Sequence, residues 1–314
     1  MRTLTVTAML AVAAAALTGC GNVSFGTDEE TRSYTAPSGV TELKIAGDGG
    51  RVEVTASDTP VIKVSERLRW SNDDNKPKVE HATENGTLTL SAECARATIG
   101  VTRCGVSYRV QVPRDTPVAI DSRNGSIDAS GLGGTVRLHS EHGSIEADGL
   151  HATSATLSSR NGSIRVSGRA ATADLRSDNG SITAEGLTGD RLTARSSNGR
   201  ISLSGRVGTA DLRSDNGSVR ADGLAAERVT AVTRNGGMRF RFTEPPADVQ
   251  ATSSDGSIRV GLPAGEGYDI RTTTEDGRER IDSGVHQDPS SSHHLKLNTR
   301  NGGVTVTPAD QRSW

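Results

Sequence analysis

Acidic and histidine side chains are the residues of this sequence that could support catalysis. Asp121, Asp128 and Glu146 could be imagined as the carboxylate cluster with which repetitive β-proteins cleave sugar polymers. They fall on polar, outward positions, where a solvated surface charge is the commoner role, and no long loops are available to exclude water. The G-x-S-x-G turn that presents a nucleophilic serine is absent from the sequence. We therefore expect no catalytic residue.

The one histidine cluster lies near the C-terminus. His286, His293 and His294 are close to Asp288 in the sequence. His293 and His294 are adjacent and would point to opposite sides of a strand, so they would not converge on one metal ion. We expect neither a metal site nor a cofactor here, and the role of this segment stays open.

Asparagine recurs immediately before glycine, and this pattern can be read in two ways. The glycine- and aspartate-rich repeats that bind calcium carry G-G-x-G-x-D, which does not occur here. The alternative is a tight turn, because both residues of Asn-Gly accept positive φ. Stacked copies would form a ladder of side-chain amides. We predict a structural turn ladder of Asn124, Asn161, Asn179, Asn198, Asn216 and Asn235.

The elements that carry these residues are set by a repeat. The glycines of the turns are spaced 18 to 20 residues apart, at Gly125, Gly143, Gly162, Gly180, Gly199, Gly217, Gly236 and Gly256. Aliphatic or other apolar residues stand two and four positions after each glycine, which is the period of a strand. A second strand completes each unit. Successive units must stack, because a unit of this length cannot bury its apolar face alone. The predicted fold is all-β, a β-solenoid resembling a single-stranded β-helix, with coils of about 18–19 residues.

The same repeat defines the domain boundaries that we expect. Residues 39–120 are strand-like but irregular and would form an N-terminal β region and cap, and residues 121–307 would form the solenoid. Residues 275–294 are polar and predict a loop or flexible insertion, after which Asn301–Val306 would supply the last coil. Residues 308–314 would be a C-terminal tail. Two residues before the glycines, Arg, Glu, Arg and Asp alternate, which predicts opposite charges facing each other on neighbouring coils.

Composition narrows the class of protein further. Leu, Ile, Val and Phe make up about a fifth of the 314 residues, close to the level at which disorder becomes the default, but the net charge is only −2. Near-neutral charge argues against nucleic acid as a partner. Two Trp, three Tyr and three Phe are too few for an aromatic-lined cofactor pocket.

The first 19 residues have the layout of a secretory signal, with Arg2 followed by an apolar run. This run ends in Leu17-Thr18-Gly19-Cys20, which resembles the bacterial lipoprotein signal. The resemblance implies cleavage before Cys20 and attachment of fatty acids such as palmitate to that residue. Several acyl chains would anchor the protein stably to the membrane, on its extracytoplasmic face. Residues 20–38 are polar and would be a flexible tether.

The other two cysteines predict a disulfide. Cys94 and Cys104 remain once Cys20 is lipidated, and disulfides persist in exported proteins. Metal binding is the alternative, but two thiols without nearby histidines are weak zinc ligands. We predict a Cys94–Cys104 disulfide that closes a hairpin.

Three segments together resemble a known family. Tyr108–Pro113, Val118–Ile120 and the repeated S-x-N-G-S-I motif are similar to the bacterial DUF4097 β-strand repeat proteins, which have been labelled adhesins, over about residues 40–307. The resemblance implies a β-solenoid-like domain displayed at the cell envelope, and it carries no catalytic residues. We therefore expect a non-enzymatic envelope lipoprotein with a rigid scaffold for adhesion or recognition, whose partner is an envelope protein or a polysaccharide. The alternatives are a carbohydrate-active β-helix enzyme and a component of envelope-stress sensing.

Overall fold

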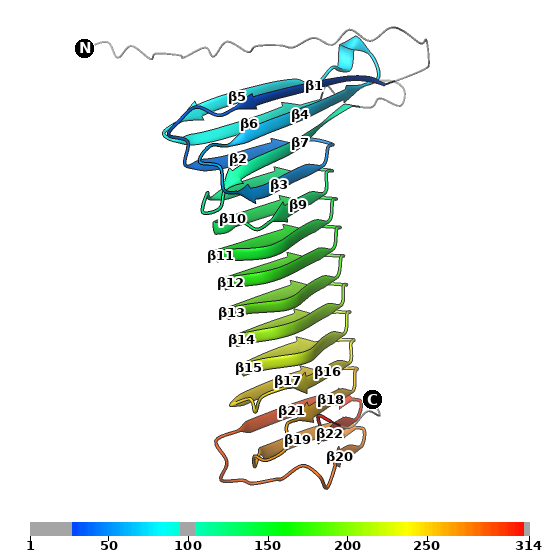
Figure 1. Cartoon of the computed structure of the whole chain (residues 1–314). Helices are drawn as coiled ribbons and strands as arrows, with labels where there is room; N and C mark the ends of the chain where they lie inside the picture. The colour runs from blue at the N-terminus through cyan, green and yellow to red at the C-terminus, as the bar shows by residue number, and fades with distance from the viewer. Residues whose placement is uncertain (1–26, 95–103, 311–314) are drawn as a thin grey trace, which may run out of the picture.

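The computed structural model describes residues 27–94 and 104–310. These residues form a single sheet of 22 strands that is wound into a long stack of coils (Figure 1). One short 3-10 helix, η1 (Asp73–Asn75), interrupts the strands near the N-terminus. The N-terminal strands are β1 (Asp28–Thr35), β2 (Glu42–Gly47), β3 (Val52–Ser57), β4 (Lys63–Trp70), β5 (Lys78–Glu84), β6 (Thr87–Glu93), β7 (Cys104–Pro113) and β8 (Val118–Ser122). The all-β solenoid prediction is confirmed.

The central coils stack in parallel and in register. Their strands are β9 (Ile127–Ser130), β10 (Gly133–Ser140), β11 (Ile145–Ser159), β12 (Ile164–Ser177), β13 (Ile182–Ser196), β14 (Ile201–Ser214), β15 (Val219–Thr233), β16 (Met238–Phe242) and β17 (Asp248–Ser253). In each coil we call the segment after the Asn-Gly turn the first arm, and the segment before the next turn the second arm. Both arms alternate buried and exposed residues, and their buried side chains share one core.

The two arms were expected to be separate strands, and in β11 to β15 they are continuous. Each of these strands bends at one glycine with positive φ, for example Gly149, Gly168 or Gly205, where the pairing register also shifts. A bulge of this kind turns a strand without ending it. The arms separate again at β16 and β17, because Pro245 and Pro246 have no N–H group to donate to the ladder.

The turn glycines are required for a different reason from the one predicted. None of the eight turn glycines, which run from Gly125 to Gly256 at 18- to 20-residue intervals, has positive φ, and neither do the asparagines before them. Instead, a Cβ atom placed on each of these glycines would lie only 1.8 to 2.2 Å from the carbonyl oxygen of the glycine on the neighbouring coil. The backbones of successive turns approach too closely for any side chain, so close contact, not a left-handed turn, selects glycine.

The two ends of the stack depart from sequence order. At the N-terminal end, β2 pairs with both β6 and β8, and β3 pairs with both β7 and β9. At the other end, the last coil in the sequence consists of β21 (His294–Asn301) and β22 (Val304–Pro308). It lies between two coils that come earlier in the sequence. One is formed by β17 and β18 (Ile258–Leu262), and the other by β19 (Asp269–Asp276) and β20 (Glu279–Ile281). The coil predicted to be last is therefore second from the end, and part of the predicted 275–294 loop is strand β20.

The N-terminal cap also corrects the predicted tether. Residues 28–35 form β1, which pairs antiparallel with β4 along its full length, and β4 in turn pairs antiparallel with β7. Two acidic residues of the predicted tether are held by ion pairs. Glu29 lies 3.0 Å from both Arg67 and Arg69, and Glu30 lies 2.8 Å from Lys76. The core is continuous from Ala36 to Val306 and crosses the boundary expected at residue 120.

Candidate functional site

The predicted turn asparagines lie in one column along the stack. The side chain of Asn179 donates to that of Asn161 at 2.8 Å, and the same bond recurs through Asn198, Asn216 and Asn235 at 2.7 or 2.8 Å. Asn124 is separated from this run by His142 and donates to Asp48 at 3.4 Å. The amides bind each other, which gives them a structural role in the turns.

A second column, of buried hydroxyl groups, was not predicted. In most coils a Ser or Thr three residues before the glycine donates to the glycine carbonyl of the neighbouring coil; Ser177, for example, donates to Gly162 O at 3.0 Å and accepts from Gly180 N at 2.9 Å. These hydroxyls satisfy backbone groups that are buried inside the turn. Nine residues of this column are buried: Ser122, Ser140, Ser159, Ser177, Ser196, Ser214, Thr233, Ser253 and Thr299. Their fixed position relative to glycine is visible in the sequence and could have revealed them.

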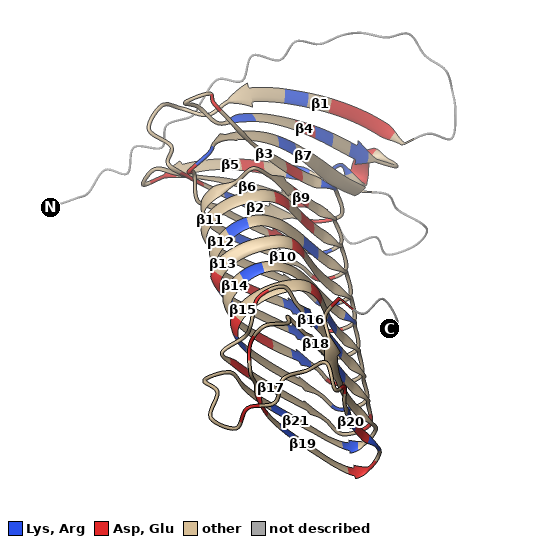
Figure 2. Ribbon diagram, turned by 60° about the horizontal axis from the view of Figure 1, so that its bottom comes forward, with Lys and Arg blue, Asp and Glu red and all other residues tan. Residues whose placement is uncertain are grey.

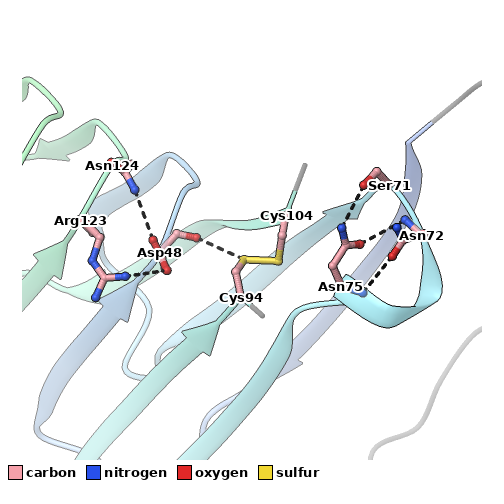
Figure 3. The surroundings of a disulfide bond; sticks show 8 residues. All are labelled: Asp48, Ser71, Asn72, Asn75, Cys94, Cys104, Arg123 and Asn124. Carbon is pink, nitrogen blue, oxygen red and sulfur yellow. Dashed lines mark hydrogen bonds and ion pairs between the residues drawn. A yellow bond between two sulfur atoms is a disulfide. The ribbon is translucent and has the colours of Figure 1, made fainter. Parts of the chain in front are cut away.

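The disulfide connects the cap to the start of the turn column. Cys94 and Cys104 are bonded, with Cα atoms 5.8 Å apart, which confirms the predicted pair (Figure 3). The backbone carbonyl oxygen of Asp48 lies 3.9 Å from the Cys94 sulfur, and the carboxylate of Asp48 contacts Arg123 at 3.1 Å. The crosslink thus fixes the strand ends on which the first repeated turn stacks.

The three carboxylates considered for catalysis do not converge. Asp128 is held by Arg51 in a two-pronged contact with distances of 2.5 and 2.8 Å, and Glu146 lies 3.8 Å from Arg165. Asp121 belongs to the second arm, whereas the other two belong to the first. Asp128 and Glu146 are therefore paired surface charges.

Asp121 instead joins a row that resembles a catalytic triad in composition. The register places Asp121, His139 and Ser158 side by side on β8, β10 and β11, and His139 Nδ1 lies 2.8 Å from the Ser158 hydroxyl. The row lines an open depression of about 480 Å³ on the outer face of the second arm. A triad also needs donors for an oxyanion, but the N–H groups of these parallel strands are used by the ladder. The row therefore lacks part of the machinery for acyl transfer.

The C-terminal histidines have separate partners. His293 Nδ1 lies 2.9 Å from the carbonyl oxygen of Pro246, and His294 Nδ1 lies 3.2 Å from Asp269. Asp288 accepts hydrogen bonds from the hydroxyl and then the backbone N–H of Ser290, and these bonds lower the pKa of its carboxyl group. Across residues 27–94 and 104–310, no group of three or more His, Cys, Asp or Glu could hold a metal ion.

A buried polar cluster lies inside the cap. The Glu66 carboxylate is fully buried, with one oxygen 2.6 Å from His81 Nε2 and the other without a partner among the described residues. The hydroxyls of Tyr34 and Tyr108 are likewise unbonded there. Burial, and then the charge of Glu66, raises the pKa of both tyrosines. These hydroxyls therefore remain protonated, and the cluster is part of the interior of the cap.

The outer faces of the arms carry straight columns of side chains, because the coils stack in register. Arginine occupies three consecutive positions in two of these columns. On the second arm Arg176 is opposite Arg195, and Arg195 is opposite Arg213. The other column lies on the first arm of later coils and contains Arg220, Arg239 and Arg259. A surface of this kind presents one chemical group at a regular interval, which suits recognition of a repetitive partner.

Comparison with known proteins assigns the fold to a family. The profile of the Toastrack DUF4097 family matches residues 40–307. The chain belongs to the DUF4097 family. None of the curated proteins matches this chain. Cys20 and the predicted signal lie outside the described residues, and no helix in the part of the chain that the structure describes is long and apolar enough to cross a membrane.

Several solved structures are similar to this DUF4097 protein. A candidate adhesin of Parabacteroides merdae is 14% identical, with a TM-score of 0.50 over 88% of this chain and 95% of its own. A candidate adhesin of Parabacteroides distasonis is 12% identical over 89% and 97% of the two chains, with a TM-score of 0.48. A candidate lipid-binding protein of the same species is 15% identical over 89% and 96%, with a TM-score of 0.46. At these identities the likeness concerns the fold alone.

Proposed function

We propose that this protein is a non-enzymatic lipoprotein of the cell envelope that presents its coil stack as a recognition or adhesion surface. The carrying observation is the register of the stack, which turns single surface residues into columns of identical groups. Asp128 and Glu146 are paired with arginines, and the row of Asp121, His139 and Ser158 lacks donors for an oxyanion. The adhesin names of the fold neighbours agree with a recognition role.

The anchor is part of this proposal. A lipidated Cys20 would hold the stack at the extracytoplasmic face of the membrane, where it could contact an envelope protein or polysaccharide. Substitution Cys20→Ser should move the protein from the membrane fraction to the medium, measured by fractionation and blotting. Unchanged fractionation would contradict the anchor.

Recognition is tested on intact cells. Crosslinking the anchored full-length protein in the envelope and recovering it should give a reproducible partner. Recovery of the protein alone, at a yield that matches a similarly anchored control protein, would argue against a recognition role.

The row of Asp121, His139 and Ser158 supplies one enzymatic alternative to test, a carbohydrate-active enzyme that hydrolyses ester groups on polysaccharides. Incubation of the full-length chain with acetylated cell-wall and plant polysaccharides should release no acetate. Turnover that disappears in Ser158→Ala would replace the proposed function with an enzymatic one.

A further inference from the structure

One column on the first arm places like charges on neighbouring coils. Arg220 on β15 lies opposite Arg239 on β16, which lies opposite Arg259 on β18. Adjacent strands are about 4.8 Å apart, and like charges directly opposite each other destabilise a sheet. The arrangement therefore costs stability in the free protein.

Few acidic groups offset this column. Its neighbours along the stack are Ser202 on one side and Thr305 on the other, both uncharged. Arg241, which lies on the same face two residues after Arg239, is 3.6 Å from Asp222. Among the described residues, Arg220, Arg239 and Arg259 form no ion pair. We define the basic patch as Arg220, Arg239 and Arg259; Figure 2 shows the basic segments of these coils around the β16 and β18 labels.

The arginine column of the second arm is an internal contrast, because its geometry is the same and two of its three arginines are paired with carboxylates. Arg176 lies 3.9 Å from Asp178, and Arg195 lies 3.5 Å from Asp211. The fold thus tolerates three stacked arginines with carboxylates beside them. In the part of the chain that the structure describes, no carboxylate pairs with Arg220, Arg239 or Arg259, so their guanidinium groups are available to an external anion.

The spacing of the basic patch selects among anionic partners. Guanidinium groups bind carboxylates, sulfates and phosphates through paired donors, and here one group recurs per coil along a straight line. Phe240 and Phe242, the aromatic residues of these coils, are buried, so the patch offers no surface on which nucleic acid bases could stack. It also presents no apolar side chain that could enter a membrane, because its outward residues are Arg, Asp, Ser, Thr and Gly.

We propose that the basic patch binds a linear polysaccharide that carries an acidic group on successive sugars, with the polymer extended along the stack. This inference rests on the proposed recognition function and names its ligand class. Successive arginines would each engage one acidic group, and the polymer would relieve the repulsion between them.

Polygalacturonate oligomers are the probe, because each of their sugars carries a carboxylate, and neutral dextran is the control ligand. Binding to the full-length chain is measured by calorimetry at two salt concentrations. We expect binding to polygalacturonate that weakens as salt rises, because surface charges are screened, and no binding to dextran.

The matched variants are two triple substitutions. Arg220→Gln with Arg239→Gln and Arg259→Gln should weaken binding about tenfold or more, since three charge-assisted contacts are lost. Arg176→Gln with Arg195→Gln and Arg213→Gln removes the same charge from the second arm and should leave the affinity within about twofold. Circular dichroism checks that both variants fold. An equal loss in the two variants, or no loss in the first, would overturn the proposal.

Failure of the proposed ligand class and failure of the proposed function would give different results. A folded, membrane-anchored chain that captures an envelope partner but shows no affinity for polygalacturonate would overturn the ligand class and keep the recognition role. A chain that binds the polymer through the basic patch, yet fractionates away from the membrane, would support the ligand and contradict the anchor.

Discussion

The central coils and the N-terminal cap are held together by different kinds of contact. In the central coils each stabilising group is repeated in a column, as with the turn glycines, the buried hydroxyls and the asparagine amides. The cap uses contacts that occur once: a disulfide, antiparallel strands and the ion pairs of Glu29 and Glu30. A substitution in the central coils therefore changes contacts with the equivalent residues of two neighbouring coils. A substitution in the cap changes the contact with one specific partner.

Replacement of a turn glycine should have the largest effect. In Gly180→Ala the new Cβ would lie 2.1 Å from the carbonyl oxygen of Gly162, so the coils must separate. We expect a loss of about 4 kcal/mol or more in the free energy of unfolding, measured by urea denaturation. Gly186→Ala is the matched control: it has positive φ but open space around it, and should cost about 1–2 kcal/mol. Equal costs would mean that close approach does not select the turn glycines.

Removal of the disulfide should loosen the cap and spare the stack. The bond joins residues ten apart in the sequence, so Cys94→Ser with Cys104→Ser should cost about 2–4 kcal/mol. Hydrogen exchange is the informative measurement. Amides of β5 and β6 should exchange faster, while those of β12 to β14 keep their protection. Uniform loss of protection would show that the two regions unfold as one unit.

Interruption of the asparagine ladder should have a smaller effect. Asn198→Ala removes one hydrogen bond to Asn179 and one from Asn216. Both are exposed, so we expect a loss of about 1 kcal/mol by thermal denaturation. Asn124→Ala, which removes a single 3.4 Å contact to Asp48, should cost less. A larger cost for Asn124 than for Asn198 would argue that the ladder adds nothing to the turns.

The smallest expected effect concerns acid stability of the cap. Hydrogen bonds from Arg32 and Lys76 lower the pKa of Glu30 from 4.5 to about 2. A carboxylate with a lowered pKa in the folded state contributes stability above the pKa of the unfolded chain and loses it as the pH falls. The contribution should be complete above about pH 4.5 and decline toward pH 2, and solvent screening keeps it small.

The measurement is amide exchange of β1 across this pH range, in the native chain and in Glu30→Gln. The native chain should lose protection relative to the variant as the pH falls. Parallel curves would show that Glu30 does not link β1 to pH.

The sequence supports prediction where position within the repeat determines the environment. Ile182 and Leu203 could be assigned to the core from their distance to a glycine, and both are buried. The order of coils at the C-terminal end could not be predicted, because the coil of β19 with β20 comes first in the sequence, yet the coil of β21 with β22 pairs with β17 and β18. Only tertiary packing decides which of these two coils lies inside. The turn glycines were located correctly and explained wrongly, since Asn-Gly does not distinguish a positive φ from a close backbone contact.

The candidate surface shows the same limit. Cys94 and Cys104 could be paired by counting, whereas Ser177 and its equivalents required the geometry of the turn to reveal their acceptors. The arginines of the basic patch are visible in the sequence, but whether Arg239 has an acidic neighbour depends on the pairing register and on side chains from other coils. Charge balance is therefore a property of the assembled column.

The doubling back of the chain at both ends has a consequence for how the protein could change length in evolution. A ten-residue segment, Thr172–Ser181, recurs identically at Thr209–Ser218, 37 residues further on, which corresponds to two coils. The coils at each end pair only with coils near that end. Gain or loss of two coils in the middle of the stack would therefore leave the pairing at both ends unchanged. The molecule would then become longer or shorter in steps of about 10 Å, as a spacer of adjustable reach.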